Sequence, residues 1–552
     1  MLSIKTLERL MSRRFTKFVF LLAVLSLSLS VQGAEVEDTA GADAVATIIQ
    51  SLNTGDYESR LASAQRLADT KDSRGLEVLT ALLGGDLYER RSDKLIVLAD
   101  KTEDGYQLKS LLTDADLGSV GRRGVRKVKL NNKLRSRLRE MIANIRLFSE
   151  DAETRLAAVE EMMSSMDGAS GLLVNKALKV ETDDAVRNQM QSALLLLDLE
   201  SSDKEKRLVA IDLLKHNLST PVRSRLTALL EDNALDYETR EKASKALKKI
   251  EVTLENYRLI ETVFFGLSLG SVLVLAAIGL AITFGVMGVI NMAHGELIML
   301  GAYSAYVVQQ IMPNHIGLSI VVAIPVAFLV AGLVGIAIER GVIRFLYGRP
   351  LETLLATFGI SLVLQQAVRS IFSPLNRSVS TPEWMSGSFE IVQGLSFTYN
   401  RLYILLFSLM VFFVLLLVLQ RTRLGLEVRA VAQNRKMARA MGVRSNWVDA
   451  LTFGLGSGIA GVAGVALSQL TNVGPNLGQA YIVDSFMVVV FGGVGNIWGT
   501  LVAGLSLGVA NKFLEPWAGA VMAKVVVLVF IILFIQKRPR GLFPQKGRAA
   551  EG

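Results

Sequence analysis

Residues 288–303 read GVINMAHGELIMLGAY and lie inside a long apolar region of the chain. This stretch places Asn291, His294 and Glu296 among Val, Ile, Met and Leu side chains. Ionisable groups are costly at the centre of a bilayer, so they are rare in membrane-spanning segments and usually mark a functional site. The stretch therefore predicts either a metal or catalytic site or a bend in a helix that lines a path through the membrane.

The composition indicates a soluble half joined to a membrane half. The chain has 552 residues, 51% of them hydrophobic, with a formal net charge of +9 and no Cys. Residues 35–255 are rich in charged side chains, whereas residues 256–545 contain long apolar runs separated by short charged islands. Because the basic residues gather in these islands, we attribute the positive charge to membrane orientation and expect no nucleic-acid partner. The absence of Cys excludes disulfides, thiol catalysis and Cys-ligated metal.

Residues 1–34 have the pattern of a secretory signal peptide. Basic residues precede the apolar run 18–29, and small residues follow it. A first transmembrane helix is the alternative, but the run is short for a bilayer. Cleavage of the segment stays open, as does the choice of Met1 or Met11 as the start. We expect residues 35–255 to lie in a bacterial periplasm.

The soluble half carries a repeated helical pattern. Four segments share an Asp, an Arg four residues later and apolar residues at helical spacing: DYESRLASAQRL from 56, DAETRLAAVEEM from 151, DKEKRLVAIDLL from 203 and DYETREKASKAL from 236. We expect each Asp to cap the N-terminus of a helix, and each Arg to pack or to pair with the acid four residues earlier. Related starts at 151 and 183, and at 203 and 236, are 32 and 33 residues apart, which predicts an α-solenoid of HEAT or armadillo type.

Between residues 89 and 138 this repeat lapses. The stretch GSVGRRGVRKVKLNNKLRSRLRE, residues 118–140, is strongly basic, and we expect a loop that runs into a helix. The basic surface of residues 118–140 is expected to be either a solvated face or a docking surface for an acidic partner. Because the soluble half has one His, no Cys and no Gly-rich phosphate loop, we expect an interaction module or a structural cap rather than an enzyme.

The membrane half contains nine apolar runs whose orientation follows from the basic loops. The runs are 259–284, 286–311, 317–338, 353–372, 401–420, 447–470, 482–497, 498–514 and 521–536. Short loops rich in Lys and Arg stay in the cytoplasm, which places 339–352, 420–446 and the basic tail from Lys537, with its end 546–552, inside. The segment 373–400 has more acidic than basic residues and is expected outside.

These orientations agree only if residues 482–514 cross the membrane twice or re-enter it from one side. The small and polar residues that suit a break between two half-helices there are Gly492, Gly493, Gly495 and Asn496. The whole chain is thus predicted to be all-α, with eight or nine membrane segments. In the run 447–470, Gly454, Gly458, Gly461 and Gly464 form a surface of small residues that lets helices approach closely, within one subunit or at a dimer interface.

Three motifs resemble those of one transporter family. FGVMGVINMAHGELIMLGAY resembles the signature of membrane permeases of branched-chain amino acid (LIV-I type) ABC transporters. RTRLGLEVRAVAQNRKMARAMGVRSNWVDALTF resembles the cytoplasmic coupling loop of that family, and VVFGGVGNIWGTLVAGLSLG its late glycine-rich segment. The motifs occur in order across 258–545. With a secreted helical extension ahead of it, this architecture is most similar to the permeases of urea transporters in that family.

The resemblance implies an importer built from two related permeases, two cytoplasmic ATPases and a periplasmic binding protein, with no cofactor on this chain. Since the chain has no G-x-x-x-x-G-K-[ST] stretch, ATP hydrolysis is expected on a partner, and the chain is not expected to be an enzyme. The loop 421–446 is helical in pattern from Leu426 to Met441 and is expected to dock on the ATPase; the alternative is a basic loop on anionic lipid headgroups. The residues expected to serve coupling are Arg429, Ala430, Asn434, Ala438 and the C-cap candidate Gly442.

A metal site at the opening stretch is disfavoured, because His294 and Glu296 are two residues apart and few other ligands are available. We expect instead a helix break at 293–295, eased by Gly288 and Gly295, whose polar groups either hold freed backbone or line the path. Urea, which is small and neutral, would need hydrogen-bonding walls. The path residues that we predict are Asn291, His294, Glu296, Gln365, Gln366 and Asn496. Branched-chain amino acids or short amides are the alternative substrates, and a passive urea or amide channel is the alternative mechanism.

Overall fold

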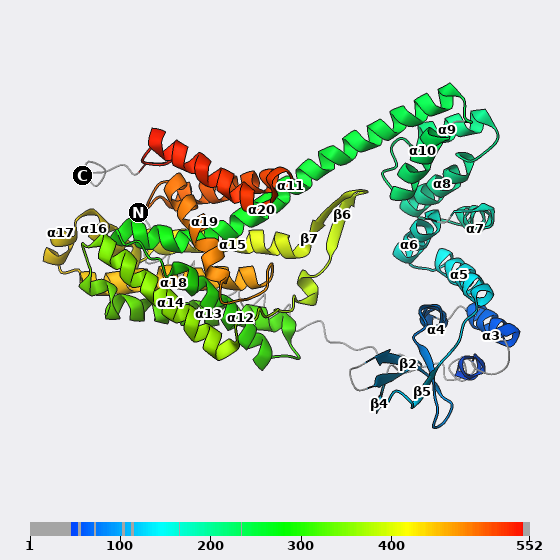
Figure 1. Cartoon of the computed structure of the whole chain (residues 1–552), viewed down its shortest axis with the longest axis horizontal. Helices are drawn as coiled ribbons and strands as arrows, with labels where there is room; N and C mark the ends of the chain where they lie inside the picture. The colour runs from blue at the N-terminus through cyan, green and yellow to red at the C-terminus, as the bar shows by residue number, and fades with distance from the viewer. Residues whose placement is uncertain are drawn as a thin grey trace, which may run out of the picture. The chain divides into compact units, whose positions relative to one another are not determined.

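The computed structural model describes residues 46–544 except 53–56, 71–72, 102–104, 112–114, 165 and 233. The predicted signal peptide and the tail 546–552 lie outside the described residues. The chain divides into two compact units, Met1–Ala210 and Ile211–Gly552, each with its own core. Figure 1 shows the elements of both units along the chain.

The first unit begins with two helices and an antiparallel sheet. The elements are α3 (Tyr57–Asp69), α4 (Ser73–Gly84), β1 (Leu87–Arg90), β2 (Ile96–Lys101), β3 (Tyr106–Ser110), β4 (Asp116–Val120) and β5 (Val125–Lys127). The strand order is β4-β3-β2-β1-β5, so the last strand returns to lie beside the first. Leu87 and Ile96 of the sheet share a core with Leu67 of α3 and Leu79 of α4.

The sheet corrects the all-α prediction and the predicted loop between residues 89 and 138. Val97, Leu108 and Val125 are buried together, whereas Lys109 and Arg126 point to the exposed side. This alternation is the pattern of a strand with one buried face. It is spread over strands of three to six residues and was obscured by the high density of charged side chains.

A series of helices completes the first unit. They are α5 (Asn132–Leu147), α6 (Ala152–Met163), α7 (Gly168–Leu178), α8 (Asp184–Asp198) and α9 (Lys204–Leu214), which crosses the boundary between the units after Ala210. Helices α6 and α7 both pack against α8. The predicted N-caps are confirmed at Asp151 and Asp183, whose carboxylates accept hydrogen bonds from the N–H groups of Thr154 and Val186.

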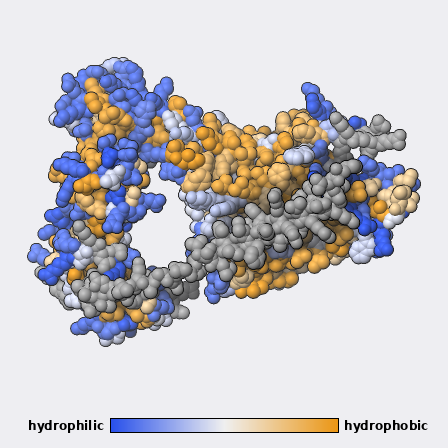
Figure 2. All heavy atoms as spheres, turned by 180° about the vertical axis from the view of Figure 1, so that it is seen from behind, coloured by the Kyte–Doolittle hydropathy of each residue, from blue (hydrophilic) through white to orange (hydrophobic). Residues whose placement is uncertain are grey.

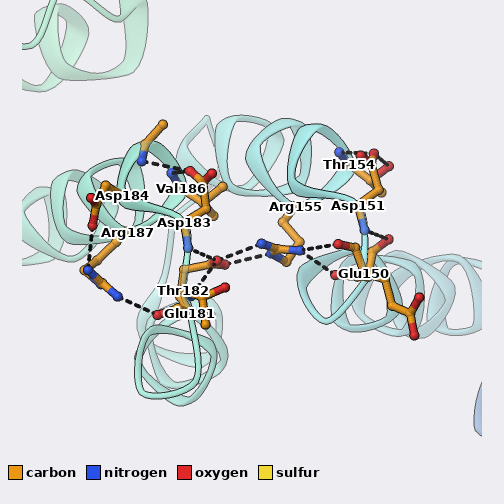
Figure 3. Close-up of polar contacts among 12 residues, drawn as sticks. Glu150, Asp151, Thr154, Arg155, Glu181, Thr182, Asp183, Asp184, Val186 and Arg187 are labelled. Carbon is orange, nitrogen blue, oxygen red and sulfur yellow. Dashed lines mark hydrogen bonds and ion pairs between the residues drawn. The ribbon is translucent and has the colours of Figure 1, made fainter.

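The repeated Arg residues have structural partners other than the acid four residues earlier. Arg155 forms two 2.8 Å hydrogen bonds with the Glu181 carboxylate, which comes from the next repeat (Figure 3). Arg155, Arg187 and Arg207 each donate to the backbone carbonyl six residues earlier, at 2.8, 2.8 and 2.6 Å. Each Arg therefore fixes the turn that precedes its own helix.

The second unit starts with α10 (Thr220–Glu231) and a helix of 51 residues, α11 (Tyr237–Met287). At 1.5 Å per residue, α11 is about 76 Å long, more than twice the hydrocarbon thickness of a bilayer. The expected domain boundary at 255/256 falls inside this continuous helix. The last predicted repeat, whose Asp236 caps α11, therefore runs directly into the first apolar run.

The other helices of the second unit follow the predicted apolar runs. They are α12 (His294–Ile311), α13 (Ile316–Gly341), α14 (Pro350–Phe372), α15 (Tyr399–Arg421), α16 (Arg423–Gln433), α17 (Arg435–Ala440), α18 (Ser445–Ser468), α19 (Leu477–Gly492) and α20 (Ile497–Lys537). The 3₁₀ turns η1 (Ile343–Phe345) and η2 (Glu383–Met385) and the hairpin β6 (Ser388–Val392) and β7 (Leu395–Thr398) complete it. Among the described helices, six are long and apolar enough to cross a membrane. Figure 2 shows hydrophobic residues over much of the outer surface of this unit.

Helix α18 lies at the centre of the second unit and packs against α11, α12 and α13. Its glycines make close backbone contacts within this one chain: a Cβ at Gly464 would collide with the carbonyl of Ile298 in α12, and one at Gly461 would lie 2.5 Å from the carbonyl of Ala327 in α13. The predicted surface of small residues is thus used for packing within the subunit.

Candidate functional site

The chain bends between α11 and α12. Helix α11 ends at Gly288, which has a φ of +66°, and α12 begins at His294. The break therefore precedes the expected position at 293–295. Gly295 lies in the first turn of α12, where a Cβ would be 2.6 Å from the carbonyl of Gly478, so this glycine allows α12 to approach α19.

Asn291 and His294 attach the bend to its surroundings. The Asn291 Oδ1 atom accepts a hydrogen bond of 3.0 Å from the N–H of Ala293. The His294 Nε2 atom lies 2.8 Å from the carbonyl oxygen of Ala276 in α11, so this nitrogen carries the proton and donates. Both side chains are completely buried. The bend is thus held by side chains that satisfy backbone groups, which is how irregular backbone is tolerated at membrane depth.

Glu296 joins α12 to α14. Its Oε1 atom accepts hydrogen bonds from the Ser361 hydroxyl at 2.6 Å and from the Gln365 amide at 2.7 Å. One turn before Ser361, on the same face of α14, the Thr357 hydroxyl accepts a hydrogen bond of 3.1 Å from the N–H of Met292. The neighbouring Gln366 is exposed on another face of α14 and does not contact Glu296.

Thr357 and Ser361 were not predicted as site residues. The signal was present in the sequence, because Thr353, Thr357, Ser361 and Gln365 recur every four residues in an apolar helix. That spacing places polar side chains on one face of a helix.

Four polar atoms of the bend and of α12, near the seam that Glu296, Ser361 and Gln365 form between α12 and α14, are buried without a partner. They are Asn291 Nδ2, His294 Nδ1, Glu296 Oε2 and Tyr303 Oη. Buried polar groups are nearly always hydrogen-bonded, so each of these atoms is available to a water or a small solute. The set contains donors and acceptors, and Glu296 is its one acidic side chain.

A cavity lies at the far end of the same helix pair. It has a volume of about 590 Å³ and is lined by the last turns of α12 and α14, including Tyr306, Gln310, Ser370 and Arg377. Ser373, at its rim, has φ 78° and ψ 155°, a backbone conformation that only Gly adopts readily. The cavity is open, and Arg377 is the one cationic side chain in its lining.

No metal site is formed by the described residues: no three His, Asp or Glu side chains among them are close enough together to hold an ion.

The glycine-rich segment forms the turn between α19 and α20. Gly493 and Gly495 have φ angles of +104° and +78°. Asn496 caps α20 by accepting from the N–H of Gly499, and its amide donates to the carbonyl of Phe543 at 3.2 Å. Since Phe543 follows α20, the turn lies at the end of the unit where the chain leaves its last helix. The oxygen and the nitrogen of the Asn496 side-chain amide are thus both hydrogen-bonded at this turn, and neither bonds to Glu296.

The expected coupling segment is two helices rather than one. Asn434 breaks the predicted helix and caps α17 by accepting from the N–H of Met437. Gly442 follows α17 with a φ of +88°. The Arg429 guanidinium donates to the carbonyl of Leu419.

The small residues of this segment face the chain itself. Ala438 is buried with Val428, Val431 and Val448, and Ala430 packs at the edge of the same cluster. The surface that α16 and α17 present outward instead carries large apolar side chains, with Leu426, Met437 and Met441 exposed by 61%, 60% and 79%.

Comparison with known proteins assigns the second unit. Residues 262–535 match the family described as "Branched-chain amino acid transport system / permease component". The chain is 33% identical over 298 residues to the high-affinity branched-chain amino acid transport system permease protein BraD of Pseudomonas aeruginosa, covering 96% of that protein and 52% of this chain.

More distant relatives cover a similar part of the chain. Identity to the high-affinity branched-chain amino acid transport system permease protein LivH of Salmonella typhimurium is 31%, covering 94% of that protein and 51% of this chain. Identity to the ribose import permease protein RbsC of Escherichia coli is 25%, covering 85% of that protein and 50% of this chain. No solved structure matches the chain.

Proposed function

The chain belongs to the family of branched-chain amino acid transport system permease components, and we propose that it is the membrane subunit of an ATP-driven ABC importer for urea. In this proposal the seam between α12 and α14 forms part of the translocation path. Asn291, His294, Glu296 and Gln365 contact the solute or hold the walls that do. Gln366 and Asn496 are less favoured, because one is exposed on another face and the other is fully used at the α19–α20 turn.

The observation that carries the urea proposal is the set of unpaired polar atoms at the bend. Urea offers one carbonyl acceptor and N–H donors on both sides, and the seam offers Asn291 Nδ2 as a donor and Glu296 Oε2 as an acceptor. A neutral solute that carries both hydrogen-bond donors and acceptors can pair with these buried atoms, whereas the apolar side chain of an amino-acid solute would leave them unpaired. The relative from Pseudomonas aeruginosa is matched over 96% of its length by 52% of this chain, so it has no counterpart of the helical extension. A helical extension ahead of the permease also supports urea as the substrate, because this architecture resembles that of the urea permeases of this family.

A branched-chain amino acid is the second candidate, and the names of the relatives favour it. Arg377, at the outer cavity, is the kind of group that recognises a carboxylate. A passive channel is disfavoured because α16 and α17 form a folded segment with an exposed apolar surface, which a channel without a cytoplasmic partner has no need of.

The proposed importer has several further subunits besides this chain. Of two cytoplasmic ATPases, one docks on α16 and α17 of this chain, a second related permease completes a heterodimer and carries the other, and a periplasmic binding protein delivers the solute. The chain lies in a bacterial inner membrane after a signal peptide, with residues 35–255 as a periplasmic helical-repeat domain and the C-terminus in the cytoplasm. The backbone of α20 is non-helical at Gly519, with φ 75° and ψ 160°, which separates residues 497–518 from residues 520–537. The α19–α20 turn beside Phe543 supports two crossings by residues 477–518, because the turn and Phe543 then both lie on the cytoplasmic side.

Uptake of radiolabelled urea and leucine, at micromolar concentration, in a strain that lacks this gene tests the proposal. We expect urea uptake to be lost and to return with the plasmid-borne gene, while leucine uptake is unchanged. Loss of leucine uptake with unimpaired urea uptake would replace urea by a branched-chain amino acid. Urea flux that persists after ATP depletion would indicate a channel.

A further inference from the structure

Arg435, at the start of α17, contacts two other elements of the second unit. Its guanidinium forms an ion pair with Asp449 in the first turns of α18. The same group lies over the ring of Tyr347, with 3.8 Å between the guanidinium carbon and the ring centroid. Tyr347 belongs to the connection between α13 and α14. One side chain thus joins α17 to the starts of two membrane helices.

This contact is protected from solvent. The Asp449 side chain is 4% exposed and the Arg435 side chain 20% exposed. By contrast, Arg423 in α16 pairs with Glu427 while 90% of its own side chain is exposed. Surface ion pairs contribute little to rigidity, whereas a desolvated pair with a planar guanidinium on an aromatic ring has one favoured geometry.

The contacts around Arg435 extend the attachment. Arg439, one turn later in α17, donates to the Ser445 hydroxyl at 2.6 Å and to the Asn446 amide oxygen at 3.2 Å. The inner face of α17 is therefore bonded to the first turn of α18 by both of its arginines. On the adjacent side, Arg340 of α13 lies 4.3 Å from the centroid of the Trp447 ring in α18.

Helix α18 in turn cannot shift independently of α12. A Cβ at Gly301 of α12 would collide with the carbonyl of Gly461, so the two backbones are in direct contact. Tightly packed interiors respond to a displacement by moving as rigid bodies rather than by deforming. A movement of α17 is therefore passed through α18 to α12, which carries His294 and Glu296.

We propose that Arg435 is a positioning residue that converts movement of α17 into movement of α18 and α12, and so couples ATP hydrolysis to transport. This inference rests on the proposed importer function. Arg435 does not contact the solute or the nucleotide. Asp449 and Tyr347 hold its guanidinium, and loss of either leaves α17 able to move without α18.

The test uses the complete complex of both permeases, ATPases and binding protein in proteoliposomes, with [¹⁴C]urea uptake and ATP hydrolysis measured together. For Arg435→Ala we expect binding-protein-stimulated hydrolysis to stay within about twofold of wild type while urea taken up per ATP falls at least tenfold. The charge exchange Arg435→Asp with Asp449→Arg should restore part of the lost coupling. Arg349→Ala, which removes an exposed ion pair outside α16 and α17, should leave the ratio unchanged.

A wild-type coupling ratio in Arg435→Ala would overturn the inference. If that variant does not assemble, Tyr347→Leu and Asp449→Asn test the inference instead, because both keep the Arg435 side chain. A wild-type coupling ratio in both of these variants would also overturn the inference. A parallel fall of uptake, hydrolysis and complex yield without rescue by the charge exchange would reduce Arg435 to a folding role. Failure of the proposed function has a different signature: wild-type complex then shows no ATP-dependent urea uptake at all.

Discussion

Among the individual residues of the seam, Glu296 and its two hydrogen-bond donors, Ser361 and Gln365, are where a single substitution is most informative. Gln365 donates to Glu296, whereas Gln366 is exposed on another face of the same helix. Replacing Gln365 by Leu leaves a buried acceptor short of one hydrogen bond, which costs about 1–3 kcal/mol. We expect Gln365→Leu to lower uptake by roughly tenfold or more and Gln366→Leu to have little effect. Uptake rates normalised to the amount of inserted protein provide the measurement; equal effects of the two changes would remove Glu296 and Gln365 from the path.

Arg155 and Glu181 of the first unit form a buried ion pair, with side chains 12% and 2% exposed (Figure 3). Removing one partner of a buried pair leaves an uncompensated charge, so Arg155→Ala should lower the local free energy of unfolding by about 3 kcal/mol. Arg137→Ala, in a pair exposed by 58% and 50%, should cost less than about 0.5 kcal/mol. Hydrogen exchange in the full-length protein measures both, in α6 to α8 for Arg155→Ala and in α5 for Arg137→Ala. Similar protection in the two variants would contradict the prediction.

The same pair predicts how stability depends on pH. The hydrogen bonds from Arg155 lower the pKa of Glu181, and the Thr154 hydroxyl likewise lowers the pKa of Asp151. A carboxylate whose native pKa is lowered stabilises the fold fully above its unfolded pKa of about 4, and this stabilisation is lost as the pH falls through the native pKa. We expect the protection of α6 to α8, corrected for intrinsic exchange rates, to decrease below about pH 4 in wild type. The decrease should be smaller in Glu181→Gln, which has no charge to lose at that position.

At the scale of elements, the hairpin β6–β7 braces the long helix α11. The Gln393 amide oxygen accepts from the N–H of Leu218 before α10, and Glu261 in α11 accepts from the N–H of Ser396. The Phe397 ring lies 4.5 Å from that of Phe264 in α11. Since α15 starts directly after β7 and ends directly before α16, the hairpin links the base of the extension to the expected coupling segment.

A disulfide tests this brace, because the chain has no Cys of its own. A Cβ at Gly394 would lie 3.9 Å from the Cβ of Leu218, close to the mean of about 3.8 Å in disulfides. We expect Leu218→Cys with Gly394→Cys to form a bond in an oxidising periplasm, despite some strain from the φ of +85° at position 394. Gly387, also at positive φ, serves as the control when paired with Leu218→Cys. Thiol labelling under non-reducing conditions should find two free thiols in the control and none in the test pair; two in both would show that the hairpin does not contact α10.

The elements that the sequence predicted are those whose pattern is local. The Asp N-caps act within one turn, and the glycines of α18 mark close packing because small residues have that use in membrane helices. Thr357 and Ser361 were missed although their four-residue spacing is visible in the sequence, and three further features were missed because each depends on residues outside its own helix or strand. Glu181 comes from another repeat to bind Arg155, the sheet pairs short strands, and Asp449 fixes Arg435 across the turn between α17 and α18.

At the scale of the whole molecule, the orientation of the second unit determines what every proposed site does. In the proposed topology, the basic loops put α16 and α17 inside the cell, and the signal peptide puts the first unit outside. Nine crossings, one on each side of the α19–α20 turn beside Phe543 among them, then lead from an outer start to an inner C-terminus. With the first unit outside, an even total would put the C-terminus outside, and an even number of crossings before α16 would put the coupling segment on the wrong side of the membrane for an importer.

Single Cys variants of the naturally Cys-free chain test this orientation directly. Leu172 of α7 and Met441 after α17 are 73% and 79% exposed, and Val494 in the α19–α20 turn is 37% exposed. We expect an impermeant maleimide to label Leu172→Cys in cells whose outer membrane alone is opened, and Met441→Cys and Val494→Cys only after the inner membrane is permeabilised. Labelling of Val494→Cys from outside would replace two crossings by a re-entrant segment and leave the coupling proposal intact. Labelling of Met441→Cys from outside would remove α16 and α17 from the reach of any ATPase, and with them the importer mechanism.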